Sequence, residues 1–459
     1  MTKSSIASRK KMWKLGIRDF NTQYFDFNKD GDLIAKEGNN IYNIRYLAEK
    51  FGTSLEILFP YIIEERVEDL LDLSDAIIKR LKYQGKFFYH YPMKSNQTKE
   101  VVLAMVGEGA NIETSSYNEL YIIKKMLEQE SFNDKMRILC NGPKTDKYIN
   151  LIDELQHRRL KIVPIIEGPS ELKTFQFSKY DVGIRLDMPV KSKANWNKQI
   201  DRFGFSRKEL LKMSPFKNLK ILHYRIGKLE KASDIIESTK YALNVYFKMK
   251  ETNPTLDTLD IGGGMPIPFE RNKKYSIEKI LEKLFELLKK ESEKRGVPHP
   301  NLICEWGRFM VAPAQITIFK VIDTKNIVNK GVEAKKWYVI DGSFMNDLVD
   351  TWGINQKWSV APVKSRPDVK LNDVWMAGSS CDSDDIYTGI DESVTLPDYN
   401  YSENDPFYIV FFDTGAYQDA LASHHCMLSS PIKIIAENGH IVVARKRESP
   451  EDVGKEFGW

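Results

Sequence analysis

The stretch Phe87-Phe88-Tyr89-His90-Tyr91-Pro92-Met93-Lys94-Ser95-Asn96 opens the most regular part of the chain. Its aromatic residues predict a buried strand, and a lysine follows at the end of that strand. A lysine is rarely fully buried unless it has a partner or a chemical task. One such task is covalent attachment to an aldehyde, which requires a desolvated amine. The alternative is an ordinary strand end whose Lys94 reaches solvent, and this stretch taken alone favours that alternative.

Outward from this stretch, short apolar runs alternate with amphipathic segments. The runs predicted as strands are 87–93, 110–114, 136–140, 160–166, 182–186, 219–226, 256–261 and 301–304. Helical periodicity is found over 42–52, 62–83, 117–129, 145–156, 233–250 and 276–295. Because strands and helices alternate along the chain, we predict an α/β fold with a parallel (β/α)8 barrel of the TIM type.

Each predicted barrel strand carries polar residues at or near its C-terminal end. In chain order they are Lys94, Glu113, Asn141 with Gly142, Glu167, Arg185, His223 with Arg225, Gly262 to Gly264, and Glu305 with Gly307 and Arg308. Barrel enzymes place their chemistry at this end of the strands, so these groups are expected to converge on one mouth. Any single one could be an ordinary surface residue, but their recurrence on every predicted strand favours a site.

After about residue 312 the chain is predicted to form strands with few helices. The strand-like runs are 315–322, 337–340, 406–412, 432–435 and 440–443, with turn signals at Asp341-Gly342 and Asn438-Gly439. We predict an all-β domain here, completed by the N-terminal hairpin. The expected division is an N-terminal segment over 1–55, the barrel over 56–312 and the C-terminal β domain over 313–459.

Residues 26–37 match the calcium-loop pattern D-x-[DN]-x-[DN]-G-x5-E. A calcium loop of this kind lies between two helices. Here the preceding residues are strand-like, and Asp30-Gly31 is a strong hairpin signal. We therefore predict a β-hairpin and no metal site.

Composition excludes several classes of protein. The 459 residues exceed what one core usually supports, and 42% apolar with 29% charged residues is ordinary for a folded chain. The net charge of +4 is spread along the chain, so nothing indicates a nucleic-acid partner, and no apolar run is long enough to span a bilayer. The basic N-terminus lacks an apolar signal core, and the four cysteines form no CxxC motif. A cytoplasmic protein with reduced thiols is expected.

Three of the polar groups fit one cofactor. Glycines such as Gly262 to Gly264 let backbone N–H groups surround a phosphate, and Arg308 could add a bidentate contact. Glu305 could hold a heterocyclic nitrogen protonated. Together with Lys94, a phosphate site and an acid facing the ring nitrogen are what pyridoxal 5'-phosphate requires.

The motifs as a set resemble the fold-type III pyridoxal-phosphate decarboxylases of basic amino acids. The matching motifs are Tyr91–Gln97, Ile112-Glu113, Cys140–Gly142, Asp260–Gly264, Glu305–Arg308, Trp352–Ile354, Cys381–Asp384 and Gly415–Gln418. Within that family the likeness is greatest to the biosynthetic bacterial arginine decarboxylases. It extends from the hairpin at 24–34 to about residue 428.

The resemblance implies a role for each matched residue. Lys94 would bind the cofactor aldehyde, Glu305 would face the ring nitrogen, and Cys381 would reprotonate the substrate carbon. Asp382, with Asp384 and Asp385 beside it, would recognise the distal cation of the substrate. The remaining cofactor contacts would come from Glu113, Arg185, Arg225, Gly262, Gly263, Gly264, Gly307, Arg308 and Tyr417. In this family the loop that holds Cys381 reaches the partner subunit's active site, so a homodimer is implied.

The sequence also departs from the family pattern. Strand six of the family ends in His-[apolar]-Gly-Ser, where this chain has Arg225-Ile226-Gly227-Lys228, and Trp306 stands in place of proline or serine. The predicted function is decarboxylation of L-arginine to agmatine and carbon dioxide in polyamine biosynthesis. The alternatives are a decarboxylase of ornithine, lysine or diaminopimelate, and a non-catalytic regulator with a decarboxylase fold.

Overall fold

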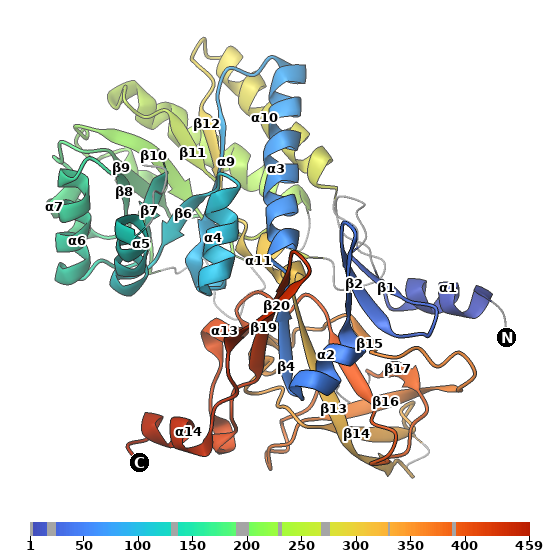
Figure 1. Cartoon of the computed structure of the whole chain (residues 1–459). Coiled ribbons are helices and arrows are strands. Elements are labelled where there is room, and N and C mark those ends of the chain that lie inside the picture. The colour runs from blue at the N-terminus through green and yellow to red at the C-terminus, as the bar shows by residue number, and fades with distance from the viewer. Residues whose placement is uncertain are drawn as a thin grey trace. The chain divides into compact units, whose positions relative to one another are not determined.

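The computed structural model describes residues 3–15, 24–129, 136–189, 202–227, 232–267, 276–328, 331–387 and 392–459. These residues form two compact units (Figure 1). The barrel unit contains the described residues from Glu64 to Met310. The β unit contains those up to Ile63 and those from Val311 onward.

Eight parallel strands close the barrel, which confirms the predicted fold class. They are β5 (Phe87–Pro92), β6 (Asn111–Thr114), β7 (Arg137–Cys140), β8 (Lys161–Ile166), β9 (Val182–Leu186), β10 (Leu219–Tyr224), β11 (Thr258–Asp260) and β12 (Asn301–Cys304). The ring closes where β12 pairs with β5, with Leu302 opposite Phe87. Apolar side chains from several strands pack together in its core, among them Leu139, Val163 and Ile303.

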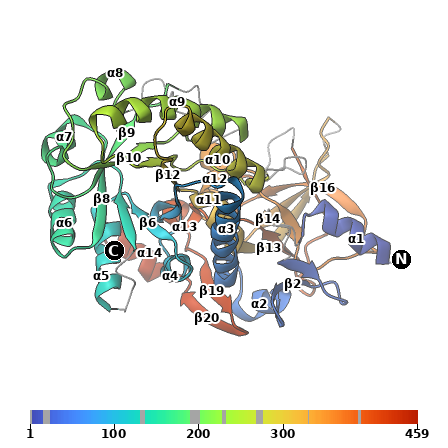
Figure 2. The ribbon, with the colours of Figure 1, turned by 90° about the horizontal axis from the view of Figure 1, so that it is seen from above.

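Helices lie outside the ring of strands (Figure 2). They are α3 (Pro60–Leu81), α4 (Lys99–Gly107), α5 (Tyr117–Gln129), α6 (Asp146–His157), α7 (Pro169–Phe175), α8 (Arg207–Leu210), α9 (Ala232–Thr252), α10 (Ile277–Glu293) and α11 (Gly307–Val311). Helix α10 shows why these segments are helical. The Ser276 side chain caps its first turn, and Ile277, Leu281, Leu284 and Leu288 recur at helical spacing and are buried.

The β unit is built around a nine-stranded mixed sheet. Its strands are β4 (Leu55–Leu58), β13 (Gln315–Asn326), β14 (Lys336–Ile340), β15 (Val360–Pro362), β16 (Leu371–Ala377), β17 (Val394–Pro397), β18 (Tyr408–Phe411), β19 (Ile432–Glu437) and β20 (His440–Arg445). The five predicted runs correspond to β13, β14, β18, β19 and β20. The unit also contains the helices α1 (Lys3–Met12), α2 (Ile44–Phe51), α12 (Val349–Ile354), α13 (Gln418–Leu421) and α14 (Pro450–Glu456).

The predicted border at residue 55 is wrong. It would cut β4, which pairs with β13 on one side and with β19 on the other. A four-residue strand with all of its side chains buried belongs to the sheet that pairs it. The division between the units therefore falls at Ile63 and Glu64.

The N-terminal hairpin forms as predicted, but in a sheet of its own. Strands β1 (Phe25–Phe27) and β2 (Leu33–Glu37) are antiparallel, and β3 (Asn40–Asn43) completes a three-stranded sheet. Asp26 pairs with Lys10 at 2.5 Å and with Lys36 at 3.1 Å. The Asn28 side chain accepts the backbone N–H groups of Asp30 and Asp32. Asp26 and Asn28 of the calcium-like pattern therefore make contacts that stabilise the hairpin.

Buried charges tie β4, β19, β20 and α13 together. The Lys433 ammonium lies 3.3 Å from Glu56 and also pairs with Asp419. Arg445 donates to the same two acids, at 2.9 and 3.0 Å. Removing one member would leave the buried cluster with an uncompensated charge, which costs up to about 3–5 kcal/mol.

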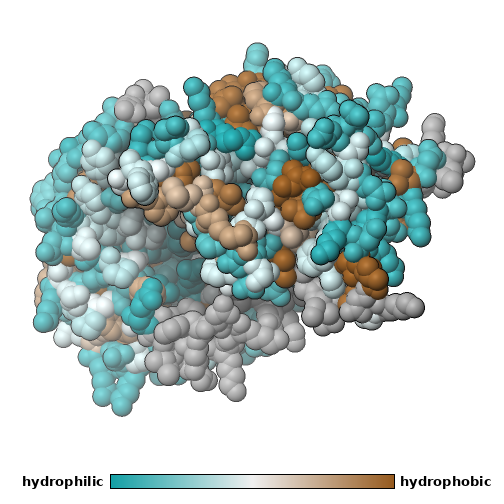
Figure 3. Space-filling view, turned by 90° about the horizontal axis from the view of Figure 1, so that it is seen from below, coloured by the Kyte–Doolittle hydropathy of each residue, from teal (hydrophilic) through white to brown (hydrophobic). Residues whose placement is uncertain are grey.

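The helices of the described residues fall short of the requirements of a membrane span. In the described ranges, no helix has both the length and the apolar composition needed to cross a bilayer. Figure 3 shows a face on which apolar patches lie among hydrophilic side chains. Scattered apolar patches of this kind are usual for a folded protein.

Candidate active site

Lys94 lies directly after β5, in the 3-10 turn η1 (Met93–Ser95). Its ammonium forms an ion pair with Glu113 of β6, whose side chain is fully buried. Burial raises the pKa of Glu113 to about 7, although the Lys94 ammonium opposes that rise. The predicted lysine therefore faces an acid that can exchange a proton near neutral pH.

Glu305 follows β12 and is buried. The Asn141 side chain, after β7, donates to its carboxylate at 2.9 Å, and the ring of His223, on β10, lies 3.8 Å from it. Burial alone would raise the pKa of Glu305. The effects of His223, Lys94 and the Asn141 hydrogen bond outweigh burial and hold this pKa well below its usual range. Glu305 is thus an oriented, ionised carboxylate inside the barrel unit.

Asp260 ends β11 and lies close to Glu305 and His223. One ligand atom from each of these three residues lies within 4.8 Å of the others, a grouping that could hold a metal ion. However, Asp260 accepts the backbone N–H of Gly262 at 2.9 Å, and Glu305 is held by Asn141. These contacts favour a positioning role for the group, and the prediction of no metal stands as a prediction.

The glycine turn after β11 could not be built from other residues. Gly262 has φ +62°, and a Cβ there would lie 2.5 Å from the Tyr224 carbonyl oxygen. A Cβ on Gly263 would lie 2.9 Å from the Glu305 carbonyl oxygen. The turn therefore lies tightly between the ends of β10 and β12. A glycine turn of this kind lets backbone N–H groups approach an anion such as a phosphate, and Gly263 and Gly264 are partly exposed.

Gly307 brings the ends of β5 and β12 together. A Cβ at this position would clash with the Ser95 side chain, next to Lys94. Arg308 follows in α11 and is half-buried. Trp306 is buried and packs edge-on against Phe309, with ring centroids 6.0 Å apart. The unusual tryptophan is thus a packing residue of the barrel unit.

Arg185 on β9 is paired with Glu167 at the end of β8, at 2.8 Å. Burial would raise the pKa of Glu167, but Arg185 and Lys144 lower it below its usual range. Lys144 and Glu171 were not predicted from the sequence. The Lys144 ammonium is buried, 3.0 Å from Glu171, and donates to the carbonyl of Gly142. Its position just after the Asn141-Gly142 strand end is the signal that could have indicated it.

Arg225 follows β10 and is half-buried. A Cβ added to Gly262 would lie 3.2 Å from the Cβ of Arg225, so Arg225 borders the glycine turn. Lys228, the other departure in this segment, lies outside the described residues. The barrel unit therefore brings together Lys94, Glu113, Arg185, Arg225, Gly262 to Gly264, Glu305, Gly307 and Arg308 at the ends of its strands.

The remaining predicted site residues lie in the β unit. Tyr417 precedes α13 with φ +71° and is half-buried. Cys381 is exposed, and its sulfur lies 3.7 Å from that of Cys426. The Asp382 carboxylate lies 3.1 Å from the His425 ring and accepts the Asp384 N–H at 2.9 Å.

Asp385 differs from its acidic neighbours, which corrects the role predicted for it. It is buried, and its carboxylate accepts the backbone N–H groups of Phe344 at 2.7 Å and Ser380 at 3.2 Å. Because these bonds occupy both oxygens, Asp385 shapes the loop and does not remain a candidate substrate ligand. Asp382 and Asp384 keep accessible carboxylates.

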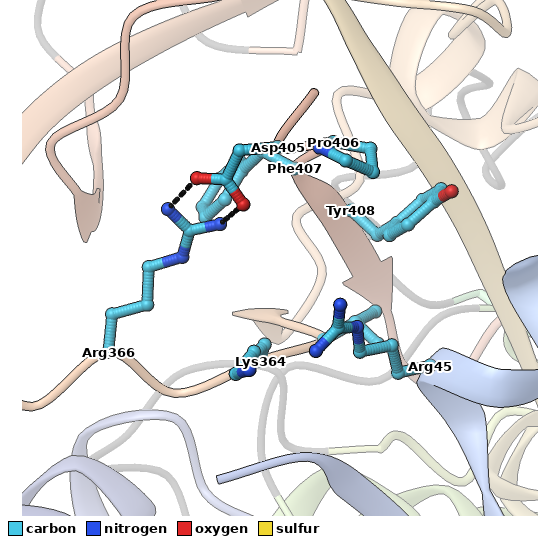
Figure 4. A pocket seen from close by; sticks show the side chains of 8 residues that line it. Arg45, Lys364, Arg366, Asp405, Pro406, Phe407 and Tyr408 are labelled. Carbon is cyan, nitrogen blue, oxygen red and sulfur yellow. Dashed lines mark hydrogen bonds and ion pairs between the residues drawn. The ribbon is translucent and has the colours of Figure 1, made fainter. Parts of the chain in front are cut away.

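A separate pocket of about 100 Å³ lies in the β unit (Figure 4). The Arg366 guanidinium binds Asp405 through two hydrogen bonds of 2.7 Å, and Arg45 pairs with Glu49 at 2.9 Å. Since these guanidinium groups already have carboxylate partners, the pocket is a weaker candidate for an anion site than the glycine turn.

Comparisons with known proteins agree with this geometry. The sequence model of the family described as "Pyridoxal-dependent decarboxylase, pyridoxal binding domain" matches residues 72–312. A biosynthetic arginine decarboxylase of Bacteroides thetaiotaomicron is 21% identical over 538 aligned residues, which cover 89% of this chain and 85% of that protein. Other curated arginine decarboxylases, for example from Phocaeicola vulgatus, match 68% of this chain and 54% of their own length. The chain thus spans about half of those relatives.

Solved structures show the same fold. The biosynthetic arginine decarboxylase of Campylobacter jejuni superposes with a TM-score of 0.81 at 18% identity, covering all of this chain and 91% of that one. The diaminopimelate decarboxylase of M. jannaschii, solved with L-lysine, has a TM-score of 0.76 at 23% identity, covering 94% of this chain and 97% of that one. At these identities the likeness establishes the fold and leaves the substrate open.

Proposed function

This chain belongs to the pyridoxal-dependent decarboxylases, and from that premise we propose that it converts L-arginine to agmatine and carbon dioxide. The family makes it a carboxy-lyase that uses pyridoxal 5'-phosphate. The observation that carries the proposal is the grouping of Lys94, Glu113, Glu305 and the glycine turn at the strand ends of one barrel.

The residues at the strand ends fit the cofactor. The turn at Gly262 has no room for a Cβ, and Glu305 is a buried, ionised carboxylate. In this proposal Lys94 binds the aldehyde, the glycine turn with Arg308 holds the phosphate, and Glu305 faces the ring nitrogen. When bound, the cofactor supplies an aldehyde for the substrate amine and a protonated ring that accepts an electron pair.

In this proposal, residues of the chain hold and transfer the protons of the reaction. The Glu305 carboxylate favours the protonated form of a ring nitrogen placed beside it. Glu113, with a pKa raised by burial to about 7, can take a proton from the Lys94 amine and return it. Cys381 is the proposed donor to the substrate carbon.

Asp382 and Asp384 are the proposed ligands of the substrate guanidinium. A guanidinium donates in a planar fork that a carboxylate accepts bidentately, whereas an ammonium is a point charge. Because Cys381 and Asp384 are exposed and Asp382 is partly exposed in a β-unit loop, we further propose that the loop completes the site of a second subunit in a homodimer.

The test compares agmatine, putrescine and cadaverine formation at equal concentrations of arginine, ornithine and lysine, with lysine formation from diaminopimelate as a further arm. Arginine should give the highest kcat/KM. Asp382→Ala should lower kcat/KM for arginine by about 10- to 100-fold, since it removes a charged hydrogen bond. Asp384→Ala removes the second proposed ligand and should lower it as well, whereas Asp323→Ala, at an exposed position of β13, is the control. A higher kcat/KM for ornithine, or an unchanged preference in Asp382→Ala, would contradict the assignment to arginine.

A non-catalytic regulator is the second candidate, favoured by one observation. Arg225, which borders the glycine turn, stands where the family pattern has histidine. A positive charge beside a protonated ring is unfavourable for catalysis. If the purified protein shows no visible cofactor band and releases no carbon dioxide from any of these substrates, the regulator is the better assignment.

A further inference from the structure

We propose that Cys381 and Cys426 form a reversible disulfide that switches decarboxylation off. The proposal rests on the function proposed above, in which the Cys381 thiol is the proton donor. It defines a redox modification site in the β unit, and its co-reactant is a peroxide or a small-molecule disulfide.

The two sulfurs are already in contact. They lie 3.7 Å apart, and both side chains are exposed, so a small oxidant can reach them. The other two cysteines, Cys140 and Cys304, are fully buried in barrel strands. Thiol oxidation depends on access, so the exposed pair should react before the buried ones.

The surrounding structure holds the two cysteine segments together. Asp385 anchors the Cys381 loop through the N–H groups of Phe344 and Ser380. Asn346 anchors the turn η4 (His425–Met427), where its side chain bonds the N–H and the carbonyl of His425. A second contact, between Asp382 and His425 at 3.1 Å, joins the same two segments beside the sulfurs. Fixed neighbours react as an intramolecular pair, which favours a disulfide over further oxidation.

Either of two oxidants can convert the two thiols to the disulfide. Hydrogen peroxide takes two electrons and two protons from the thiols, so that two S–H bonds break, one S–S bond forms, and two molecules of water leave. Exchange with glutathione disulfide gives the same bond and releases two molecules of glutathione. In both cases Cys381 loses the proton that it would deliver to the substrate carbon, and a dithiol reductant restores it.

The first experiment measures the oxidation state of the two thiols and does not depend on enzyme activity. No Lys or Arg lies between residues 371 and 432, so both cysteines fall in the single tryptic peptide Leu371–Lys433. After hydrogen peroxide and alkylation, this peptide should be lighter by two hydrogens than the fully reduced peptide and carry no alkyl group. Chymotryptic cleavage should then give two fragments joined until reduction. Two alkylated cysteines after oxidant treatment would overturn the proposal.

The second measurement reads activity in wild type and Cys426→Ser. Oxidised wild type should lose about 100-fold in kcat, as expected for loss of a proton donor, and dithiothreitol should restore it. Cys426→Ser should keep the activity of reduced wild type and show no loss that dithiothreitol reverses. Cys426 is exposed, so serine should be tolerated, and Cys426→Ala is the second variant.

These experiments distinguish a failure of the disulfide switch from a failure of the proposed decarboxylase function. If the reduced protein decarboxylates no basic amino acid, the proposed function fails, whatever the peptide shows. If the reduced protein is active and the disulfide forms without loss of activity, the switch is wrong while the function stands. Equal, reversible inactivation of Cys426→Ser would also overturn the switch, because the partner thiol would then be unnecessary.

Discussion

At the residue scale, the proposed chemistry of Lys94 depends on its neighbour Glu113. Its ammonium pairs with Glu113, a buried acid on the adjacent strand. A buried acid paired with a lysine is a means of moving protons as well as a means of holding the lysine in place. The two residues lie 19 positions apart in the chain, and parallel pairing of β5 and β6 brings them together.

We predict that Lys94→Ala abolishes both the visible cofactor band and turnover while the fold persists. The variant removes the amine that would bind the aldehyde, and a lysine that is partly exposed contributes little to the core. Absorption spectra, carbon dioxide release and circular dichroism measure the three effects. Lys86→Ala, at an exposed position before β5, is the matched control and should behave as wild type. Normal activity in Lys94→Ala would contradict the cofactor assignment.

A buried acid in the β unit makes a prediction about pH. Burial raises the pKa of Asp347 from 3.8 to about 8, and the nearby carboxylates of Glu56 and Asp385 add to the rise. An acid with a raised pKa in the folded state stabilises the fold fully below its unfolded pKa, and that contribution is lost as the pH rises toward the folded value. Asp347→Asn should therefore gain stability over wild type between about pH 4 and 8, by up to about 1.4 kcal/mol per pH unit.

Urea unfolding at about pH 5 and about pH 8 measures this difference. Asp323→Asn changes the same charge at an exposed position of β13 and serves as control. A constant difference between Asp347→Asn and wild type across this range would show that Asp347 is ionised in the folded protein at both pH values.

At the element scale, the N-terminal hairpin shows how context overrides a motif. Residues 26–37 carry the spacing of a calcium loop, yet β1 and β2 pair across it. Asp26 faces two lysines, and the Glu37 carboxylate accepts bonds from Tyr42, Asn40 and Asn438. A calcium site needs six or more oxygens around one point, and an extended hairpin spreads them along two strands.

We therefore predict that this hairpin has no useful calcium affinity. Calorimetric titration of the whole protein should show no binding in the micromolar range. Asp26→Asn provides the comparison, since it removes the first acid of the pattern. Micromolar binding that disappears in Asp26→Asn would contradict the assignment of a structural hairpin.

At the scale of the whole molecule, the proposed site residues are divided between the two units of the chain. Lys94 and Glu305 belong to the barrel unit, whereas Cys381, Asp382 and Tyr417 belong to the β unit. If the Cys381 loop completes the site of a second subunit, a mixed dimer of two inactive variants has one intact site.

Mixing Lys94→Ala with Cys381→Ala should therefore restore activity. Random exchange makes half of the dimers mixed, each with one working site of two, so about a quarter of wild-type activity is expected. The measurement is carbon dioxide release after mixing, with each variant alone as control. No recovery in a mixture whose subunits demonstrably exchange would place the donor and the lysine of each site on the same chain.

The sequence by itself was enough to predict the barrel fold and to name the candidate site residues. Strand and helix periods are local properties, and a parallel barrel places the ends of its strands at one mouth, so the periodicity alone was enough to name Lys94, Glu113 and Glu305. Tertiary structure alone decided which of these residues meet, and how. The Asn141 side chain bonds to Glu305, β4 pairs in the second sheet, and Cys381 contacts Cys426, and each contact joins residues far apart in the chain. The burial of Asp385 also depends on residues distant from it in the sequence. Such contacts depend on packing between elements, which no local pattern encodes.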